Sequence, residues 1–311
     1  MTSAEEPESL EIRMNDAGPT MFGAPRWDPD GAYDVVFVGV PTDAGGLGHR
    51  SPAAAPAFLR STSTLFPLTR DAEGVAVGWF DYVWRRDILR GVRMADAGDL
   101  PCARGRGLEP LRVLPKVYEA LRETTRLLVV LGGDHSIAYF LPPALRGEGL
   151  VWLDAHEDAS PKQGPLPDCA NVVSYLDEVD DLRAIAQVGL RGLVPADRRP
   201  PPPKRRICRS ADEVVTTLRD AGVSGAAVSV DVDVFDPGVL PAVGSAMPGG
   251  MREGDALDVL RAVRRAGLDV PVLELAEFAP ISDNDVTSAL FLVNFLLRAA
   301  SIALEADGGP R

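Results

Sequence analysis

Short apolar runs alternate along the chain with longer stretches of helical periodicity. The runs are almost continuously apolar, as in strands that are buried on both faces of a parallel sheet. They predict strands over 34–40, 127–131, 150–153, 184–189, 226–232 and 271–275. Between them, apolar residues recur at helical spacing and predict helices over 108–123, 210–221, 253–266 and 285–304. Gly222 and Gly267 stand where two of these helices should end.

This alternation predicts an α/β fold in which a mostly parallel central sheet is covered by helices on both faces, a three-layer αβα arrangement. We expect a single domain over 33–305, with an irregular lead-in over 1–32 and a short tail over 306–311. No internal repeat is visible. The basic, proline-rich segment 198–206 is expected to be an exposed, stiff loop.

Three segments place metal-ligand residue types at the end of a predicted strand. They are Gly-Gly-Asp-His-Ser at 132–136, Asp-Ala-His-Glu-Asp at 154–158 and Ser-Val-Asp-Val-Asp-Val-Phe-Asp-Pro at 229–237. Two of the three histidines in the chain lie in this set. Because ligands bind at the carboxyl ends of parallel strands, we expect the three segments to converge on one rim of the sheet.

The residue types in these segments favour a pair of divalent cations. Carboxylates and imidazoles without thiolates suit Mn²⁺ or a similar ion better than structural zinc. Residues two apart in an extended chain point to the same side, so Asp154, His156 and Asp158 aim together if the strand stays extended, as do Asp231 and Asp233. Such crowded carboxylates repel one another, and two cations would offset their charge. Each segment alone fits a capped turn or a solvated loop; only their combination favours metal.

The three motifs resemble those of the ureohydrolase superfamily, which comprises arginase, agmatinase, guanidino-acid hydrolases and formimidoylglutamase. The resemblance covers about residues 34–300 and implies an arginase-like fold with two Mn²⁺, or other divalent transition metals. It implies that the ions share a water that they acidify, and that Asp158 has a catalytic role in accepting a hydrogen bond from it. The implied ligands are His135 and Asp158 for one ion, His156 and Asp233 for the other, and Asp154 and Asp231 as bridges.

A further resemblance concerns the last predicted strand. Glu-Leu-Ala-Glu-Phe-Ala-Pro at 274–280 is similar to the segment in which the superfamily places the glutamate that grips the substrate's guanidinium group. Glu277 fills that place and is the implied catalytic, substrate-binding carboxylate. The alternative is a surface glutamate at a strand end. Segments 39–43 and 187–192 also resemble superfamily strands.

One position departs from the arginase pattern. Arginases carry a histidine shortly after the second motif that is held to shuttle protons, and Cys169 stands there in this chain. A thiol titrates further from neutrality than an imidazole, so Cys169 is a doubtful proton shuttle and is expected to be a small buried filler. The only other histidine is His49, in the first loop. The segment after the second motif also lacks the residues by which arginases hold the α-amino and α-carboxylate groups, so arginine is not the expected substrate. By the resemblance, formimidoylglutamases lack this histidine too, so its absence does not exclude an enzyme.

Composition narrows the cellular setting. The net charge of −13 argues against nucleic acid as a partner. No apolar run approaches the roughly 20 residues that span a bilayer, and the acidic start does not resemble a secretory signal. Three cysteines without CxxC spacing suggest reduced thiols. We therefore expect a cytoplasmic protein.

The function expected from these features is hydrolysis of a linear C–N bond in a small guanidino or amidino compound, with release of urea or a urea analogue and an amine. Release of formamide, as by formimidoylglutamase, is the nearest alternative. Deacetylase chemistry at a single zinc and a non-catalytic, metal-binding role are more distant ones. By the resemblance, we also expect a homo-oligomer, either a trimer or a hexamer.

Overall fold

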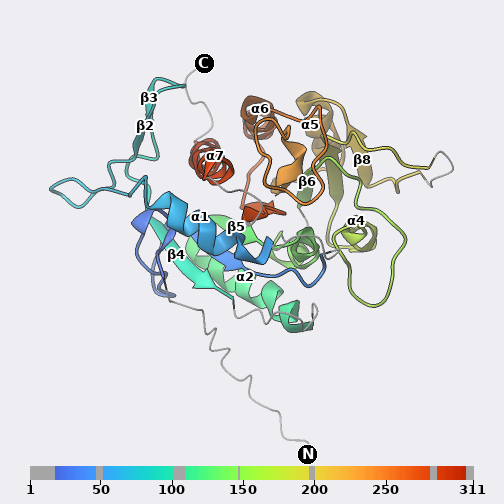
Figure 1. The fold of residues 1–311 in the computed structure, drawn as a ribbon, viewed down its shortest axis with the longest axis horizontal. Coiled ribbons are helices and arrows are strands. Elements are labelled where there is room, and N and C mark those ends of the chain that lie inside the picture. The colour runs from blue at the N-terminus through green and yellow to red at the C-terminus, as the bar shows by residue number, and fades with distance from the viewer. Residues whose placement is uncertain are drawn as a thin grey trace, which may run out of the picture.

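The computed structural model describes residues 18–46, 52–100, 109–145, 148–195, 200–280 and 286–305. Ten strands and seven helices alternate along these segments (Figure 1). The strands are β1 Tyr33–Val40, β2 Trp79–Asp81, β3 Arg86–Ile88, β4 Met94–Asp99, β5 Thr125–Gly132, β6 Gly149–Leu153, β7 Ala184–Val188, β8 Arg205–Cys208, β9 Ala226–Asp231 and β10 Val272–Ala276. The helices are α1 Ala55–Ser63, α2 Leu114–Thr124, α3 Pro142–Leu145, α4 Val172–Leu176, α5 Ala211–Asp220, α6 Glu253–Arg265 and α7 Thr287–Leu304.

Eight of the strands form one parallel sheet, in the order β4-β1-β5-β10-β9-β6-β7-β8. The four central strands, β5, β10, β9 and β6, are the ones that precede the sequence motifs. Segments that lie more than a hundred residues apart are thereby brought to neighbouring strand ends, as the sequence predicts.

Alternating side chains of the sheet enter two separate cores. Leu127 and Val129 of β5 pack on one face with α1, α5, α6 and α7, whereas Leu128 and Val130 pack on the other face with α2 and α4. Figure 1 shows α1, α5, α6 and α7 on one side of the sheet and α2 on the other. Burial on both faces explains why the strands read as continuous apolar runs. The predicted three-layer αβα fold is confirmed.

The helix termini follow the local sequence. Ser210 caps α5 by accepting a hydrogen bond from the backbone N–H of Glu213. Gly222 and Gly267 adopt φ values of +66° and +79° just after α5 and α6, which is the left-handed conformation expected at a helix end.

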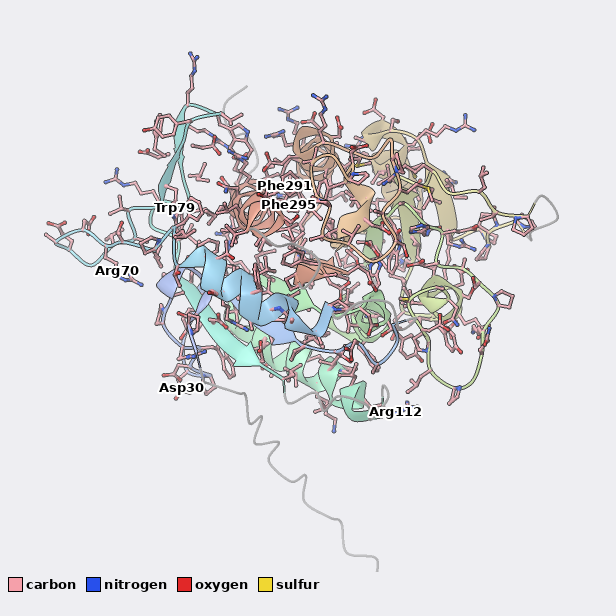
Figure 2. The ribbon with its side chains drawn as sticks, in the orientation of Figure 1. Asp30, Arg70, Trp79, Arg112, Phe291 and Phe295 are labelled. Atoms are coloured by element: carbon pink, nitrogen blue, oxygen red, sulfur yellow. The ribbon has the colours of Figure 1, made fainter. Side chains whose placement is uncertain are left out.

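The last helix, α7, is a core element. It is long and apolar enough to cross a membrane when judged by length and composition alone, but 67% of it is buried inside the fold. Phe291 and Phe295, labelled in Figure 2, project from α7 and contact the ring of Phe235 with centroid distances of 4.9 and 5.4 Å. Such burial is what the sequence pattern of a central helix requires.

Two sequence expectations need correction. Residues 205–206 of the predicted exposed loop lie in edge strand β8, and the side chain of Arg205 is buried in ion pairs; Arg198 and Arg199 lie outside the described residues. The predicted lead-in also contributes to the core, because Met21 and Phe22 are fully buried. The ring of Phe22 lies 5.8 Å from that of Phe37.

The antiparallel hairpin β2–β3 projects from the body of the molecule (Figure 1). Its outer residues expose large apolar side chains: Phe80, Tyr82 and Val83 are 53%, 86% and 72% exposed. At its base, Trp79 packs edge-on against Phe22 at a centroid distance of 5.5 Å. No pattern in the sequence predicted this hairpin.

Candidate metal centre

The glycines before the first motif allow close packing of three strand ends. A Cβ on Gly132 would lie 2.6 Å from the carbonyl oxygen of Leu275 in β10, and one on Gly133 would lie 2.1 Å from the carbonyl oxygen of Thr42 after β1. Neither position admits a side chain without moving backbone. The pair of glycines therefore seats the end of β5 tightly between its two neighbours.

Each of the three motifs turns in the same way after its strand. An aspartate oxygen accepts a hydrogen bond from the backbone N–H two residues later: Asp134 from Ser136 at 3.0 Å, Asp154 from His156 at 2.6 Å and Asp231 from Asp233 at 2.8 Å. Aspartate favours this local turn because its short side chain reaches its own backbone. The turns fold each motif back over the sheet rim.

These turns correct the geometric part of the sequence argument. The chain does not stay extended beyond the strands, because 232–234 form a 3₁₀ turn and Asp158 has a φ of +48°. The predicted convergence occurs, but turns rather than strand alternation produce it. If the backbone had stayed extended after β6, Asp158 would lie beyond the rim of the sheet.

His135 lies at the centre of the first ligand group. Its Nδ1 atom is 3.2 Å from Asp231, 3.4 Å from Asp154 and 3.5 Å from Asp158, measured to one carboxylate oxygen each. The imidazole is fully buried and stacks on the ring of Trp152 at a centroid distance of 3.9 Å. Nδ1 has no hydrogen-bond partner among the described residues. A buried nitrogen facing three carboxylates without a bond is suited to a shared cation.

His156 forms the second group, nearer to solvent. Its Nδ1 atom lies 2.8 Å from Asp233 and 3.7 Å from Asp154, and its side chain is 31% exposed. The potential ligand atoms of each group lie within 4.8 Å of one another. Asp154 offers an oxygen to both groups, as expected of a bridge, whereas Asp231 belongs to the first. The six predicted ligands are thus brought together, although their roles as ligands stay a prediction.

The electrostatics of the cluster fit bound cations. Burial raises the pKa values of Asp158 and Asp231 well above their usual range, and neighbouring aspartates raise them further. Burial lowers the pKa of His135, but its contacts with Asp154 and other carboxylates outweigh this and raise it well above normal. The hydrogen bond with Asp233 raises the pKa of His156 to about 9. Without cations the cluster holds protons, and divalent ions neutralise the same charge.

Glu277 lies beside this cluster, at the end of β10. Its Oε1 atom accepts a hydrogen bond from the backbone N–H of His135 at 2.8 Å, and its own N–H donates to the carbonyl of Gly133 at 2.9 Å. The residue has a φ of +66°, a strained conformation for a side chain other than glycine. Burial raises its pKa to about 7. Glu277 is therefore held rigidly where the sequence predicts a substrate-binding carboxylate.

A cleft of about 1280 Å³ opens over the cluster. Asp158, Asp231, Asp233 and Glu277 line its inner part, together with Cys169. Burial and the charge of Glu277 raise the pKa of the Cys169 thiol far above its usual range, so the thiol stays protonated. The sequence predicted a small buried filler at this position, but Cys169 is only half-buried and lines the cleft.

The basic side chains around the outer part of the cleft form ion pairs with acidic side chains of the protein. Arg205 contacts Glu157 at 2.9 Å and Asp177 at 3.1 Å, and Lys162 pairs with Glu178. Arg206 pairs with Asp220 at 2.8 Å, so neither described arginine of the basic segment 198–206 presents a free guanidinium for a substrate carboxylate. His49 and the first arginines of that loop lie outside the described residues.

The residues that support the ligands were not predicted from the sequence. The indole Nε1 of Trp152 donates to Asp154 at 2.8 Å. The guanidinium of Arg191 donates to the carbonyl of Asp233 at 2.6 Å and to that of Met247 at 2.7 Å, which fixes the third motif. The hydroxyl of Ser229 lies 2.8 Å from Nε2 of His135. This support could have been predicted from the sequence, because Ser229 is a polar residue in the middle of an otherwise apolar strand.

Comparison with known proteins agrees with this geometry. A sequence profile described as the Arginase family matches residues 33–301. The chain belongs to the arginase family. Its relatives include guanidinopropionase of Pseudomonas aeruginosa, 27% identical over 98% of this chain and 96% of that protein. Proclavaminate amidinohydrolase of Streptomyces clavuligerus is 29% identical over 88% of this chain and 89% of that one.

Solved structures of the arginase family share the fold. Proclavaminate amidinohydrolase from Streptomyces clavuligerus superposes with a TM-score of 0.71 and 24% identity, over 92% of this chain and 97% of that one. Formimidoylglutamase from Bacillus subtilis also gives 0.71, at 18% identity and 95% coverage of both chains. The predicted superfamily is confirmed, and these two structures attest the fold alone.

Proposed function

We propose that this arginase-family chain hydrolyses a linear C–N bond in a small guanidino or amidino compound. Water adds to the guanidinium carbon, the bond to the alkylated nitrogen breaks, and urea or a urea analogue leaves with an amine. The observation that carries the proposal is the convergence of two histidines, four aspartates and Glu277 at adjacent strand ends, beneath a cleft that is lined by His156, Asp158, Asp231, Asp233 and Glu277.

Each side chain has a part in this reaction. Glu277 binds the guanidinium group, because a rigid, half-buried carboxylate pairs well with a planar cation. Asp158 lines the cleft and accepts a hydrogen bond from the attacking water, which orients it. The histidines and aspartates of the two groups would hold two divalent cations, and such ions would acidify a bound water and polarise the substrate. Cys169 is a poor proton shuttle, because burial raises the pKa of its thiol further from neutrality.

We infer Mn²⁺ as the preferred ion, because the donor set is rich in carboxylates and contains two imidazoles and no thiolate. Two overlapping ligand groups favour two ions per chain over the single zinc of a deacetylase. Arginine is not the expected substrate. Relatives named guanidinopropionase, agmatinase and guanidinobutyrase support a guanidino acid or amine instead.

We also propose a homo-oligomer, a trimer or a hexamer, in the cytoplasm, with no nucleic-acid or membrane partner. The projecting hairpin supports assembly, because its exposed Phe80, Tyr82 and Val83 form an apolar surface that a second copy would cover. The free thiols of Cys169 and Cys208 suit a reducing compartment. Light scattering of the purified protein tests the assembly directly, and a monomer would contradict it.

The decisive experiment is product detection by mass spectrometry. Protein loaded with Mn²⁺ is incubated with guanidino acids, agmatine-like amines and formimidoyl amino acids, with Asp231→Asn as the control. Loss of urea from a guanidino compound, absent in the control, supports the proposal. Formamide instead of urea supports the formimidoylglutamase alternative. No product from any compound, with two ions bound, would indicate the non-catalytic role.

A further inference from the structure

A chain of hydrogen bonds extends behind His135, on the side away from the carboxylates. The Nε2 atom of the ring lies 2.8 Å from the hydroxyl oxygen of Ser229 on β9. That hydroxyl donates to Oε2 of Glu274 on β10 at 2.5 Å. All three residues are completely buried. The chain thus connects three neighbouring strands underneath the metal centre.

The protons available in this series of hydrogen bonds determine which nitrogen of the His135 ring is protonated. An ionised carboxylate only accepts, and a serine hydroxyl has a single proton to donate. When Glu274 is ionised, the proton of Ser229 points to it, and the oxygen of Ser229 accepts from Nε2–H of His135. In the neutral ring, which is the form that binds a cation, the proton then sits on Nε2 and Nδ1 keeps a lone pair. This lone pair faces the three aspartates of the first ligand group.

Glu274 is otherwise an unexplained charge. Its Oε1 atom is buried and has no hydrogen-bond partner among the described residues. A carboxylate left partly unpaired inside a protein is destabilising. Glu274 does not line the cleft, so it does not contact a substrate there. Burial raises its pKa to about 7, whereas the hydrogen bond from Ser229 favours the ionised form.

His156 differs in this respect. Its ring is 31% exposed, and no described residue bonds to its Nε2 atom. The two ligand groups therefore differ in how firmly their imidazoles are held. Any effect that travels through Glu274 and Ser229 should reach the ion held by His135 and spare the ion held by His156.

We propose that Glu274 and Ser229 are positioning residues that hold the His135 ring with its proton on Nε2, leave the Nδ1 lone pair to a cation, and so strengthen the binding of one of the two ions. The inference rests on the metal site of the proposed function. Groups that orient a metal-binding histidine in this way typically change metal affinity by about 10- to 100-fold. The effect here is confined to one ion.

The test measures Mn²⁺ binding by isothermal titration calorimetry on metal-stripped protein. Glu274→Gln removes the negative charge and gives Ser229 a side-chain amide that can also donate a hydrogen bond. Ser229→Ala interrupts the hydrogen bonds between His135 and Glu274. In each variant we expect one ion to bind about 10- to 100-fold more weakly and the other to bind as in the wild type. Ser63→Ala is the matched control, because Ser63 is also fully buried and makes two hydrogen bonds far from the site. Should Glu274→Gln fail to fold, Ser229→Ala decides.

A spectroscopic readout separates orientation from general weakening. The chain has only three histidines, so nitrogen-15 labelling of histidine gives few signals. In protein loaded with diamagnetic Zn²⁺, Nε2–H of His135 should appear as a slowly exchanging proton that Ser229→Ala loses. Unchanged affinity for both ions, or an unchanged Nε2–H signal in Ser229→Ala, would overturn the proposal. Neither measurement uses turnover, so failure of the proposed reaction remains a separate result.

Discussion

Arg298 on α7 joins elements that are far apart in sequence. Its Nε atom lies 2.6 Å from Oδ2 of Asp81 on β2, and its Nη1 atom lies 2.7 Å from both oxygens of Glu253 at the start of α6. The Asp81 side chain is only 3% exposed, whereas that of Glu253 is 24% exposed. Asp81 also accepts backbone N–H bonds from Val83 and Trp84 at 2.7 and 2.8 Å. This ion pair anchors the hairpin to the core.

Replacing Arg298→Met should leave the Asp81 carboxylate buried without its cation. Removal of one partner of a buried pair costs about 3–5 kcal/mol. The two N–H bonds that Asp81 keeps reduce this cost, and the partly exposed pair with Glu253 adds at most about 1 kcal/mol. We therefore expect the free energy of unfolding to fall by about 2–4 kcal/mol. Asp81→Asn, which keeps an acceptor oxygen, should lose about 1–3 kcal/mol.

The same pair predicts a pH dependence. Burial raises the pKa of Asp81, but the hydrogen bonds from Arg298 and from the backbone outweigh this, so its pKa in the folded protein lies below the usual value. A depressed pKa contributes stability above the unfolded value of about 3.9, and this contribution disappears as the pH falls through the folded pKa. The stability difference between wild type and Asp81→Asn should be constant from pH 7 to about 5 and shrink below about pH 4.

Urea unfolding followed by tryptophan fluorescence measures both effects. A double-mutant cycle of Arg298→Met and Asp81→Asn isolates the pair, and its coupling energy should exceed about 1 kcal/mol. Arg261→Met is the control, because Arg261 also lies beside the hairpin but pairs with a 69% exposed Asp258. A coupling energy below about 0.5 kcal/mol, or equal losses in Arg298→Met and Arg261→Met, would refute the reasoning.

Three further outcomes are expected at the site. Glu277→Gln should lower kcat/KM for a guanidino substrate by at least about 100-fold, since it removes a charged hydrogen-bond acceptor; steady-state kinetics with a normal metal content would check this. Cys169→Ser should change kcat/KM less than about threefold, because the thiol takes no part in proton transfer, and a larger loss would contradict that role. Mn²⁺ at 100 times its dissociation constant should raise the free energy of unfolding by about 2.7 kcal/mol per ion. Thermal unfolding measures this effect, and EDTA should reverse it. An unchanged midpoint temperature of unfolding would count against the metal site.

The central part of the fold was predictable from sequence because its strands are buried on both faces. The runs at 127–131 and 226–232 correspond to β5 and β9, with boundaries one or two residues away. The edge strands escaped prediction for a physical reason. β8 is short and begins with two arginines, and β4 contains Asp96, which is fully buried in the middle of the strand. Ion pairs formed only in the folded protein make these sequences compatible with a sheet.

The site was predictable in its residues but not in its geometry. The order of the motifs and their places at strand ends were enough to expect convergence. Asp231 and Asp233 converge through a 3₁₀ turn that the side chain of Asp231 stabilises, and strand periodicity does not describe such a turn. The N–H of His135 bonded to Glu277 likewise depends on the contact between β5 and β10, which no local pattern reveals.

Buried polar residues within strands raise a final question, because Asp96 and Glu274 look alike in sequence. Asp96 accepts hydrogen bonds from Arg60 at 2.8 and 3.0 Å and from the backbone N–H groups of Met21 and Gly98 at 2.7 and 2.8 Å, so its charge is fully compensated. Glu274 has one bonded oxygen and one without a partner among the described residues. A buried carboxylate whose two oxygens are both hydrogen-bonded can be part of the folded structure without a ligand. A buried carboxylate with an unbonded oxygen is destabilising unless a further group, such as a cation nearby, favours its charge. By this criterion Asp96 is structural, and Glu274 belongs to the metal centre.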